Sequence, residues 1–188
     1  MTRRGFYLAD GTAVALHLGH RRSIDLDWFI TDRMEDALQL SQALREEGIP
    51  LVVGQFERGT LHATVAGVRV TVLEYRYPHL KRPALSQELG CRLASLDDLA
   101  CMKLSAIAQR GARKDFIDLY ALLQEHKSLK QMLRLYSRKF AIDDFGHVLY
   151  ALAYFDDAER EPMSNMLWKV NWRQLKEELQ KQVKTVAG

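Results

Sequence analysis

The sequence is short of cysteine and of long apolar runs, and each shortage excludes a class of protein. Its two cysteines, Cys91 and Cys101, have no Cys or His partner at metal-ligand spacing, so we expect neither a disulfide framework nor a zinc site. No apolar run approaches the ~20 residues that a membrane span requires. The first residues also lack the apolar core of a signal peptide. We therefore expect a cytoplasmic protein without membrane association.

A strong excess of charge of one sign is also missing. The chain has 188 residues, of which 47% are hydrophobic and 27% charged, and its net charge is +3. These are ordinary values for a soluble globular domain, and they permit an acidic partner without requiring one. Basic residues at Arg21-Arg22 and from Arg110 to Lys114 suit a polyphosphate or RNA.

The segment from Phe6 to Phe29 contains most of the candidate functional residues. It predicts a short apolar strand, a tight turn at Gly11, a helix from Ala13 to Leu18 and a second strand from Ile24. A Gly-Thr turn that opens a helix leaves free backbone N–H groups and a hydroxyl, which suit phosphate oxygens. The turn therefore predicts a phosphate-binding site.

Two carboxylates, Asp25 and Asp27, follow in the second strand. Alternate strand residues share a face, so the two acids point one way while Leu26 and Trp28 bury the other face. Paired carboxylates of this kind bind Mg²⁺ or Mn²⁺. The alternative is a salt-bridge network with nearby cations such as Arg21, Arg22 or Lys103.

These residues resemble a known motif. Gly11-Thr12 followed by Asp25-Leu26-Asp27 is similar to the first motif of the DNA polymerase β superfamily of nucleotidyltransferases. The longer string GTAVALHLGHRRSIDLDWF resembles the AbiEii/AbiGii-type nucleotidyltransferase toxins of bacterial toxin–antitoxin and phage-defence systems. A second block, Leu99 to Leu123, also resembles that family.

The resemblance implies a fold and a set of site residues. The fold is α+β, a polymerase β-like mixed sheet with helices, followed by a helical C-terminal region. We expect a nucleotidyltransferase core over residues 1–90 and a helical region over 91–188 that completes the cleft. The implied residues are Asp25, Asp27, Lys103 and Asp115 as catalytic groups, Asp25 and Asp27 as metal ligands, and Gly11, Thr12, Arg22, Ser23 and Lys103 as nucleotide-binding groups. Lys103 would neutralise triphosphate charge, and Asp115 would hold Lys103 or position the acceptor.

The implied activity is transfer of a nucleoside monophosphate from an NTP to an acceptor hydroxyl, with Mg²⁺ (or Mn²⁺) as the metal. The acceptor would be the end of a tRNA or another RNA, or a protein, and an antitoxin would be a partner. Two positions differ from the family pattern: Asp10 replaces a glycine, and Thr71 stands where a third acid is usual. They favour the alternative of a non-catalytic protein that keeps the fold and binds nucleotide, RNA or a partner protein. Glu74 is the nearest acid after Thr71, but strand alternation directs it to the opposite face unless a β-bulge re-aims it.

Periodicity predicts the remaining elements. A helix is expected from Met34 to Glu47, strands over 49–55, 60–65 and 68–75 with a hairpin turn at Ala66-Gly67, and a surface connector from His79 to Gln87. A helix capped by Ser95 precedes a second one from Ala112, and the chain is helical from Leu129 onward. Tyr150, Tyr154 and Phe155 fall at helical spacing and are interpreted as packing residues in preference to the alternative, a base-stacking platform.

Overall fold

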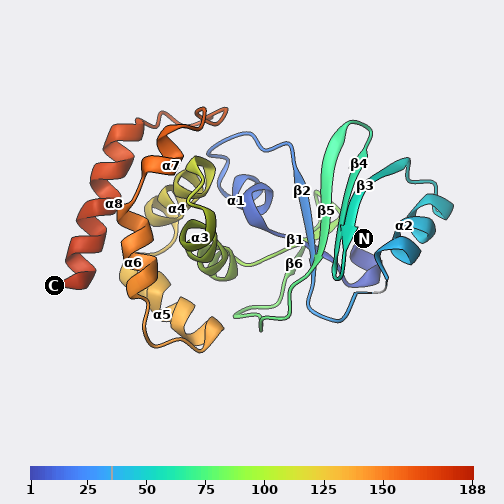
Figure 1. The fold of residues 1–188 in the computed structure, drawn as a ribbon, viewed down its shortest axis with the longest axis horizontal. Helices are drawn as coiled ribbons and strands as arrows, with labels where there is room; N and C mark the ends of the chain where they lie inside the picture. Colours follow the sequence, from blue (N-terminus) through green and yellow to red (C-terminus); the bar gives the residue numbers. More distant parts are fainter. Residues whose placement is uncertain (35) are drawn as a thin grey trace.

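The computed structural model describes residues 1–34 and 36–188, and places a mixed sheet beside a group of helices (Figure 1). The strands are β1 (Tyr7–Leu8), β2 (Leu26–Ile30), β3 (Leu51–Glu57), β4 (Thr60–Val65), β5 (Val68–Glu74), β6 (Ala84–Ser86) and β7 (Cys91–Leu93). The helices are η1 (Thr2–Arg4), α1 (Asp10–Leu18), α2 (Ala37–Glu46), α3 (Leu96–Arg110), α4 (Arg113–Glu125), α5 (Leu129–Phe140), α6 (Gly146–Ala153), α7 (Asp156–Glu159) and α8 (Trp172–Ala187). Position 35 of the expected helix over 34–47 lies outside the described residues.

The sheet is mixed, with strand order β3-β4-β5-β2-β1-β7-β6. Strand β2 is parallel to β5, and β1 is parallel to β7, whereas the other neighbours are antiparallel. The β4–β5 hairpin turns at Ala66 and Gly67, whose φ angles are +49° and +81°. Positive φ at both central residues matches the twist of the flanking strands, so the two-residue turn predicted from the sequence is confirmed.

The alternation of β2 separates two hydrophobic cores. Leu26 and Trp28 pack on a core formed by α2 and the inner faces of β3, β4 and β5, whereas Phe29 belongs to the core of the helical part. Asp27 therefore lies on the Phe29 side of the sheet, the side that faces the helices. The acids project toward the helical part, as the strand pattern indicates.

The segment from His79 to Gln87 is not a plain surface connector. It contains strand β6, which pairs with β7 through Ala84–Leu93, Leu85–Arg92 and Ser86–Cys91. Strand β7 in turn pairs with β1 at Leu8–Leu93. Strands β6 and β7 form a local hairpin, but each has only three residues, too few for a periodic pattern, and the attachment of β7 to the sheet depends on β1, which is distant in the sequence.

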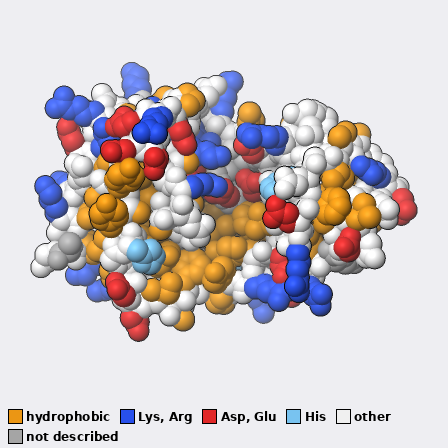
Figure 2. All heavy atoms as spheres, viewed as in Figure 1, with side chains coloured by type: hydrophobic (Ala, Val, Ile, Leu, Met, Phe, Trp, Pro, Cys, Tyr) orange, Lys and Arg blue, Asp and Glu red, His pale blue; other side chains and the backbone are white. Residues whose placement is uncertain are grey.

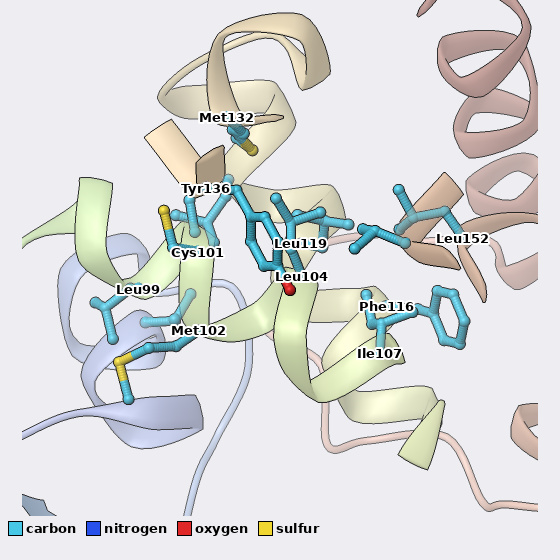
Figure 3. Packing of buried hydrophobic residues seen from close by; sticks show 14 of the residues in the cluster. Leu99, Cys101, Met102, Leu104, Ile107, Phe116, Leu119, Met132, Tyr136 and Leu152 are labelled. Carbon is cyan, nitrogen blue, oxygen red and sulfur yellow. The ribbon is translucent and has the colours of Figure 1, made fainter. Parts of the chain in front are cut away.

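The helical part begins at α3 and forms its own core around that helix. Ser95 caps α3 by accepting a hydrogen bond from the Asp98 amide, and Gly111 ends the helix with φ +56°. Leu104 of α3 and Phe116 of α4 are fully buried and point into the group of side chains shown in Figure 3. None of the helices in the described part of the chain is long and apolar enough to cross a membrane.

Candidate nucleotidyl-transfer site

Helix α1 begins at Asp10, three residues before the expected start at Ala13, so Gly11 and Thr12 lie in its first turn. Its N-cap is Ala9, and no side chain caps the first turn. The backbone N–H groups of a first helical turn have no intrahelical acceptor, and the helix dipole adds positive potential there. The start of α1 therefore presents uncapped amides that suit an anion.

The Thr12 hydroxyl ties this helix start to the strand with the acids. It donates a hydrogen bond to the Asp25 backbone carbonyl, and its oxygen lies 2.7 Å from the Ser23 hydroxyl. A hydroxyl has one proton to donate, so Ser23 donates to Thr12. Both hydroxyl protons are thereby used to hold the 23–25 segment against α1, which leaves the phosphate contacts to the backbone amides.

Asp25 and Asp27 line one cleft of about 390 Å³ at the start of α1. Its described lining residues are Asp10, Gly11, Thr12, Arg21, Arg22, Ser23, Ile24, Asp25, Asp27, Lys114, Ser164 and Asn165. Burial raises the pKa of Asp27, and the negative charges of Asp10 and Asp25 raise it further. An added cation would relieve this repulsion. In Figure 2, acidic and basic side chains meet in the hollow between the helical part and the sheet.

Asp25 already has a partner. Both of its carboxylate oxygens accept hydrogen bonds from Arg69, at 3.0 and 2.9 Å. The Arg69 side chain is 75% exposed, so solvent weakens this ion pair and the guanidinium can leave at small cost. The cation that pairs with Asp25 comes from β5 and not from the Arg21-Arg22 segment weighed in the sequence.

Thr71 lies directly beside Asp27, where the family pattern has its third acid. The two residues are paired in the β2–β5 register, and the Thr71 hydroxyl hydrogen-bonds the Asp27 side chain. His62 of β4 is paired with Thr71 in turn. Paired residues of neighbouring strands share a face, so Asp27, Thr71 and His62 form one row across the sheet.

Glu74 takes no part in this row. Its carboxylate accepts a hydrogen bond from the Met34 amide at 3.0 Å and another from Arg76. Both contacts lie on the α2 side of the sheet, among residues that line a different hollow. The opposite orientation expected from strand alternation is confirmed.

Lys103 lies behind the helix start, at the centre of a buried charge network. Its side chain is fully buried, and its ammonium group contacts Asp10, Asp115 at 2.8 Å and Asp118 at 2.9 Å. These three negative charges raise the pKa of Lys103 far above its usual range, although burial acts in the opposite direction. The ammonium is therefore charged, and three carboxylates share it.

Two arginines complete the network. Arg21 makes a double hydrogen bond with Asp118, at 2.6 and 2.9 Å, and Arg110 makes one with Asp115, at 2.7 and 2.9 Å. Three cations thus face three carboxylates in a largely buried cluster. Burial of this many charges costs several kcal/mol per ion unless each is paired, and here each has a partner.

Gly11 allows this network to approach the turn. A Cβ atom at position 11 would lie 2.5 Å from an Arg21 guanidinium nitrogen, 3.2 Å from an Asp118 oxygen and 3.6 Å from the Lys103 nitrogen. The Arg21 group is buried and bonded twice to Asp118, so it cannot move aside freely. The glycine of the motif is required by contact with the buried charges, not by a positive φ.

Asp10 has the left-handed backbone, with φ +52°. Glycine takes this conformation without strain, and aspartate is among the residues that tolerate it. Lys103 and Arg110 hold the pKa of Asp10 below its usual range despite burial. Asp10 thus lines the cleft, but Lys103 and Arg110 neutralise its negative charge.

The structure separates the expected site residues into two groups. Those that line the cleft are Gly11, Thr12, Arg22, Ser23, Asp25 and Asp27. Lys103 and Asp115 lie behind Gly11 and are not among the described lining residues. Lys114 also lines the cleft, in agreement with the expectation that the basic residues from Arg110 to Lys114 suit a polyphosphate, whereas Ser164 and Asn165 line it without any signal in the sequence. Asp118 binds His20, Arg21 and Lys103.

A divalent metal fits this donor set only as a two-carboxylate site. Among the described residues, no group of three or more His, Cys, Asp or Glu side chains could hold a metal ion. Hard carboxylate oxygens at Asp25 and Asp27 suit Mg²⁺, which usually keeps water or substrate oxygens as its remaining ligands. The raised pKa of Asp27 is consistent with a place where positive charge is lacking.

Comparison with known proteins identifies the family. The model of the nucleotidyl transferase AbiEii toxin, from a type IV toxin–antitoxin system, matches residues 74–186. An uncharacterized protein of Aquifex aeolicus is 35% identical over 181 residues, which cover 95% of this chain and 86% of that protein.

Solved structures share the fold. MenT4, a nucleotidyltransferase toxin of Mycobacterium tuberculosis, has a TM-score of 0.68 at 16% identity and covers 97% of this chain and 75% of its own. JHP933 of Helicobacter pylori has a TM-score of 0.58 at 16% identity, with 97% and 83% covered. The nucleotidyltransferase fold, a mixed sheet followed by helices, is thereby established. Since the family model spans more than half of the residues, the chain belongs to the AbiEii nucleotidyltransferase toxin family.

Proposed function

We propose that the protein transfers a nucleoside monophosphate from a Mg²⁺-bound NTP to an acceptor hydroxyl and releases pyrophosphate. One observation carries the proposal: the uncapped start of α1 and the carboxylates of Asp25 and Asp27 line the same cleft. An anion site and a cation site side by side suit a metal-bound triphosphate.

The chain supplies charge for the triphosphate from the cleft walls. The amides of Gly11 and Thr12 would face phosphate oxygens, while Arg22 and Lys114 line the same cleft and carry positive charge. Such fixed donors stabilise the charge that develops as pyrophosphate leaves. Lys103 would act differently: it would hold Asp10, Asp115 and the α1 start in place from behind.

Asp25 and Asp27 would hold the Mg²⁺ or Mn²⁺, with Arg69 released from Asp25 on binding. A metal at this position supplies charge neutralisation of the phosphates and lowers the pKa of a bound hydroxyl. The Thr71 hydroxyl would keep the Asp27 carboxylate oriented through its hydrogen bond.

The acceptor hydroxyl must lose a proton, and Thr71 cannot accept it as a carboxylate would. His62 is the next residue in the same row of the sheet and is exposed. An imidazole can take a proton near neutral pH. His62 would accept the acceptor's proton while the acceptor oxygen bonds to the α-phosphorus and the bond to pyrophosphate breaks.

Membership of the toxin family supports a proposal for the biological setting. We propose an RNA end, such as that of a tRNA, as the acceptor, with a protein hydroxyl as the alternative. An antitoxin would restrain this activity in a cytoplasmic toxin–antitoxin pair. None of these partners is present in the structure.

A non-catalytic role is the second candidate, and two observations favour it. Arg69 holds both oxygens of Asp25, and Thr71 occupies the third acidic position. If Arg69 stays bound, only Asp27 remains for a metal, and the cleft would bind nucleotide or RNA without transfer.

A labelling experiment separates the two. The purified protein is incubated with each α-³²P-labelled NTP, Mg²⁺ and total RNA, and Asp27→Asn is compared with Asp143→Asn, an exposed control outside the cleft. Labelled RNA from wild type and Asp143→Asn, but not from Asp27→Asn, supports the enzyme. Labelled protein instead changes the acceptor. Equal labelling by all three, or binding without labelling, contradicts the proposed transfer.

A further inference from the structure

The helical part carries a second hollow, of about 540 Å³, beside the nucleotide cleft. We call it the tyrosine pocket; its described lining residues are Ile107, Ala108, Gln109, Arg110, Gly111, Gly146, His147, Tyr150, Ala151, Tyr154 and Asp157. They come from the end of α3, from α6 and from the start of α7. The nucleotidyl-transfer chemistry described above uses none of them except Arg110.

Two tyrosines, Tyr150 in α6 and Tyr154 at its C-cap, present their rings to solvent at this pocket. Tyr150 is 74% exposed and Tyr154 is 44% exposed, and their rings lie nearly parallel, with centroids 6.4 Å apart and an interplanar angle of 10°. The interpretation of both as packing residues was wrong, and of the three aromatic residues only Phe155 is buried. The pattern misled because α6 buries Val148 and Leu152, which leaves Tyr150 on the outer face.

Parallel, exposed aromatic rings suit a flat and partly apolar ligand. A nucleobase stacks on such a ring whatever its sequence, and single-strand binding proteins use this contact repeatedly. Gln109, His147 and Asp157 line the same pocket and carry donors and acceptors for the edges of a base. The combination of a stacking face and polar edges is typical of nucleobase recognition.

Arg110 connects the tyrosine pocket to the nucleotide cleft. It lines the pocket, and its guanidinium lies 3.5 Å from the carboxylate of Asp10, which lines the cleft. An RNA chain that leaves the pocket on this side would therefore pass Arg110 on its way to the cleft.

The charges favour a base over a phosphate at the tyrosines. Asp157 and Asp156 raise the pKa of the Tyr154 hydroxyl, so the potential there is negative. A phosphate would be repelled at that end, whereas an uncharged base would not. Positive charge for the backbone lies instead at Arg110 and Lys114.

We propose that the tyrosine pocket holds an unpaired base of a single-stranded RNA acceptor while the RNA end reaches the cleft. The proposal rests on the proposed function, since it names how the acceptor of that reaction is held. A free NTP base and a protein acceptor are the occupants that the test must separate from it.

Binding of a fluorescently labelled single-stranded RNA oligonucleotide, followed by anisotropy without NTP, tests the proposal. We expect Tyr150→Ala to weaken RNA affinity about tenfold, since loss of one stacked base has roughly this effect. Tyr150→Phe keeps the ring and is expected to bind as wild type. Phe56→Ala removes another exposed aromatic side chain, on the α2 side of the sheet, and serves as the control.

The pocket assignment is overturned by RNA affinity that is unchanged in Tyr150→Ala, or by a matched loss of Mg²⁺-dependent NTP affinity in that variant. Wild type that binds no RNA also overturns it. Asp27→Asn separates this proposal from the transfer reaction, because it removes labelling but leaves RNA binding through Tyr150 intact. Failure of transfer with Tyr150-dependent binding thus contradicts only the proposed function.

Discussion

Asp27 shows at the residue scale how an ionised site can oppose stability. Its carboxylate is partly buried beside two other acids, Asp10 and Asp25, and only the Thr71 hydrogen bond and the Lys114 charge act against their effect among the described residues. Because the folded pKa is raised, ionisation of Asp27 costs folding free energy at every pH above its unfolded pKa. The chain keeps a charge here that its fold alone would not favour.

Replacement of that charge should separate stability from activity. We predict that Asp27→Asn abolishes Mg²⁺-dependent NTP binding yet unfolds at the same or a higher temperature than wild type at pH 7, because the amide removes the repulsion. Calorimetry of both proteins from pH 7 down to the unfolded pKa of about 3.9 checks this. The advantage of the variant should shrink as pH falls and wild-type Asp27 gains its proton. A marked loss of stability at pH 7 would contradict the raised pKa.

His62 allows a second test at the same scale. We expect His62→Gln to lower the transfer rate by roughly 10²-fold or more, a typical contribution of a general base, with NTP affinity unchanged. A proportional loss of NTP affinity would place His62 in binding and not in proton transfer.

At the element scale, α3 and α4 hold α1 through buried charges. Lys103 from α3 and Asp115 and Asp118 from α4 meet behind Gly11, with Asp10 of α1 as the third acid. The helix start that would bind phosphate is thus fixed by residues that are about a hundred positions away in the sequence.

Substitutions of Lys103 on α3 and Lys114 on α4 should therefore have different effects on stability and on NTP binding. Lys103→Met leaves buried carboxylates without their shared cation and is expected to cost about 3–5 kcal/mol of unfolding free energy. Lys114→Met removes a cation from the cleft wall, so it should weaken NTP affinity with little effect on stability. Urea unfolding and NTP titration of each variant check the contrast. If Lys103→Met is instead stable but binds NTP more weakly, Lys103 contacts the triphosphate directly, as the family resemblance implies.

Local signals account for much of what the sequence predicts at this scale. The Ala66-Gly67 turn and the Ser95 cap of α3 depend on adjacent residues, and both are confirmed. The β1–β7 pairing and the Arg69–Asp25 ion pair depend on partners that are distant in the sequence and are brought together by the fold, and periodicity does not reveal them. The row from Asp27 to His62 likewise requires strand register, which only the structure supplies.

At the scale of the whole molecule, carboxylates with lowered pKa link the sheet to the helices. Asp98 at the start of α3 accepts hydrogen bonds from Lys139 of α5 and from the Leu80 and Lys81 amides of the connector to the sheet. These partners lower its pKa against the effect of burial, and Lys103, His20 and Arg21 do the same for Asp118.

Acid should therefore lower the unfolding free energy of the protein. A lowered folded pKa contributes stability that is complete above the unfolded value of about 3.9 and is lost as pH falls through the folded pKa. We expect unfolding free energy to drop steeply below about pH 4, by ~1.4 kcal/mol for each unit of pKa difference per group. Asp98→Asn should be less stable at pH 7 and should show a flatter acid dependence than wild type. Equal slopes for both proteins would contradict the role of Asp98.

The central claim is that the α1 start and the Asp25–Asp27 pair bind a metal-bound triphosphate together. Isothermal titration with an NTP analogue that cannot be cleaved between its α- and β-phosphates, with and without Mg²⁺, measures this directly. Wild type and Asp143→Asn should bind the analogue with Mg²⁺ and much more weakly without it, and Asp27→Asn should lose the Mg²⁺-dependent part. Binding that is the same with and without Mg²⁺, or unchanged in Asp27→Asn, would contradict the account.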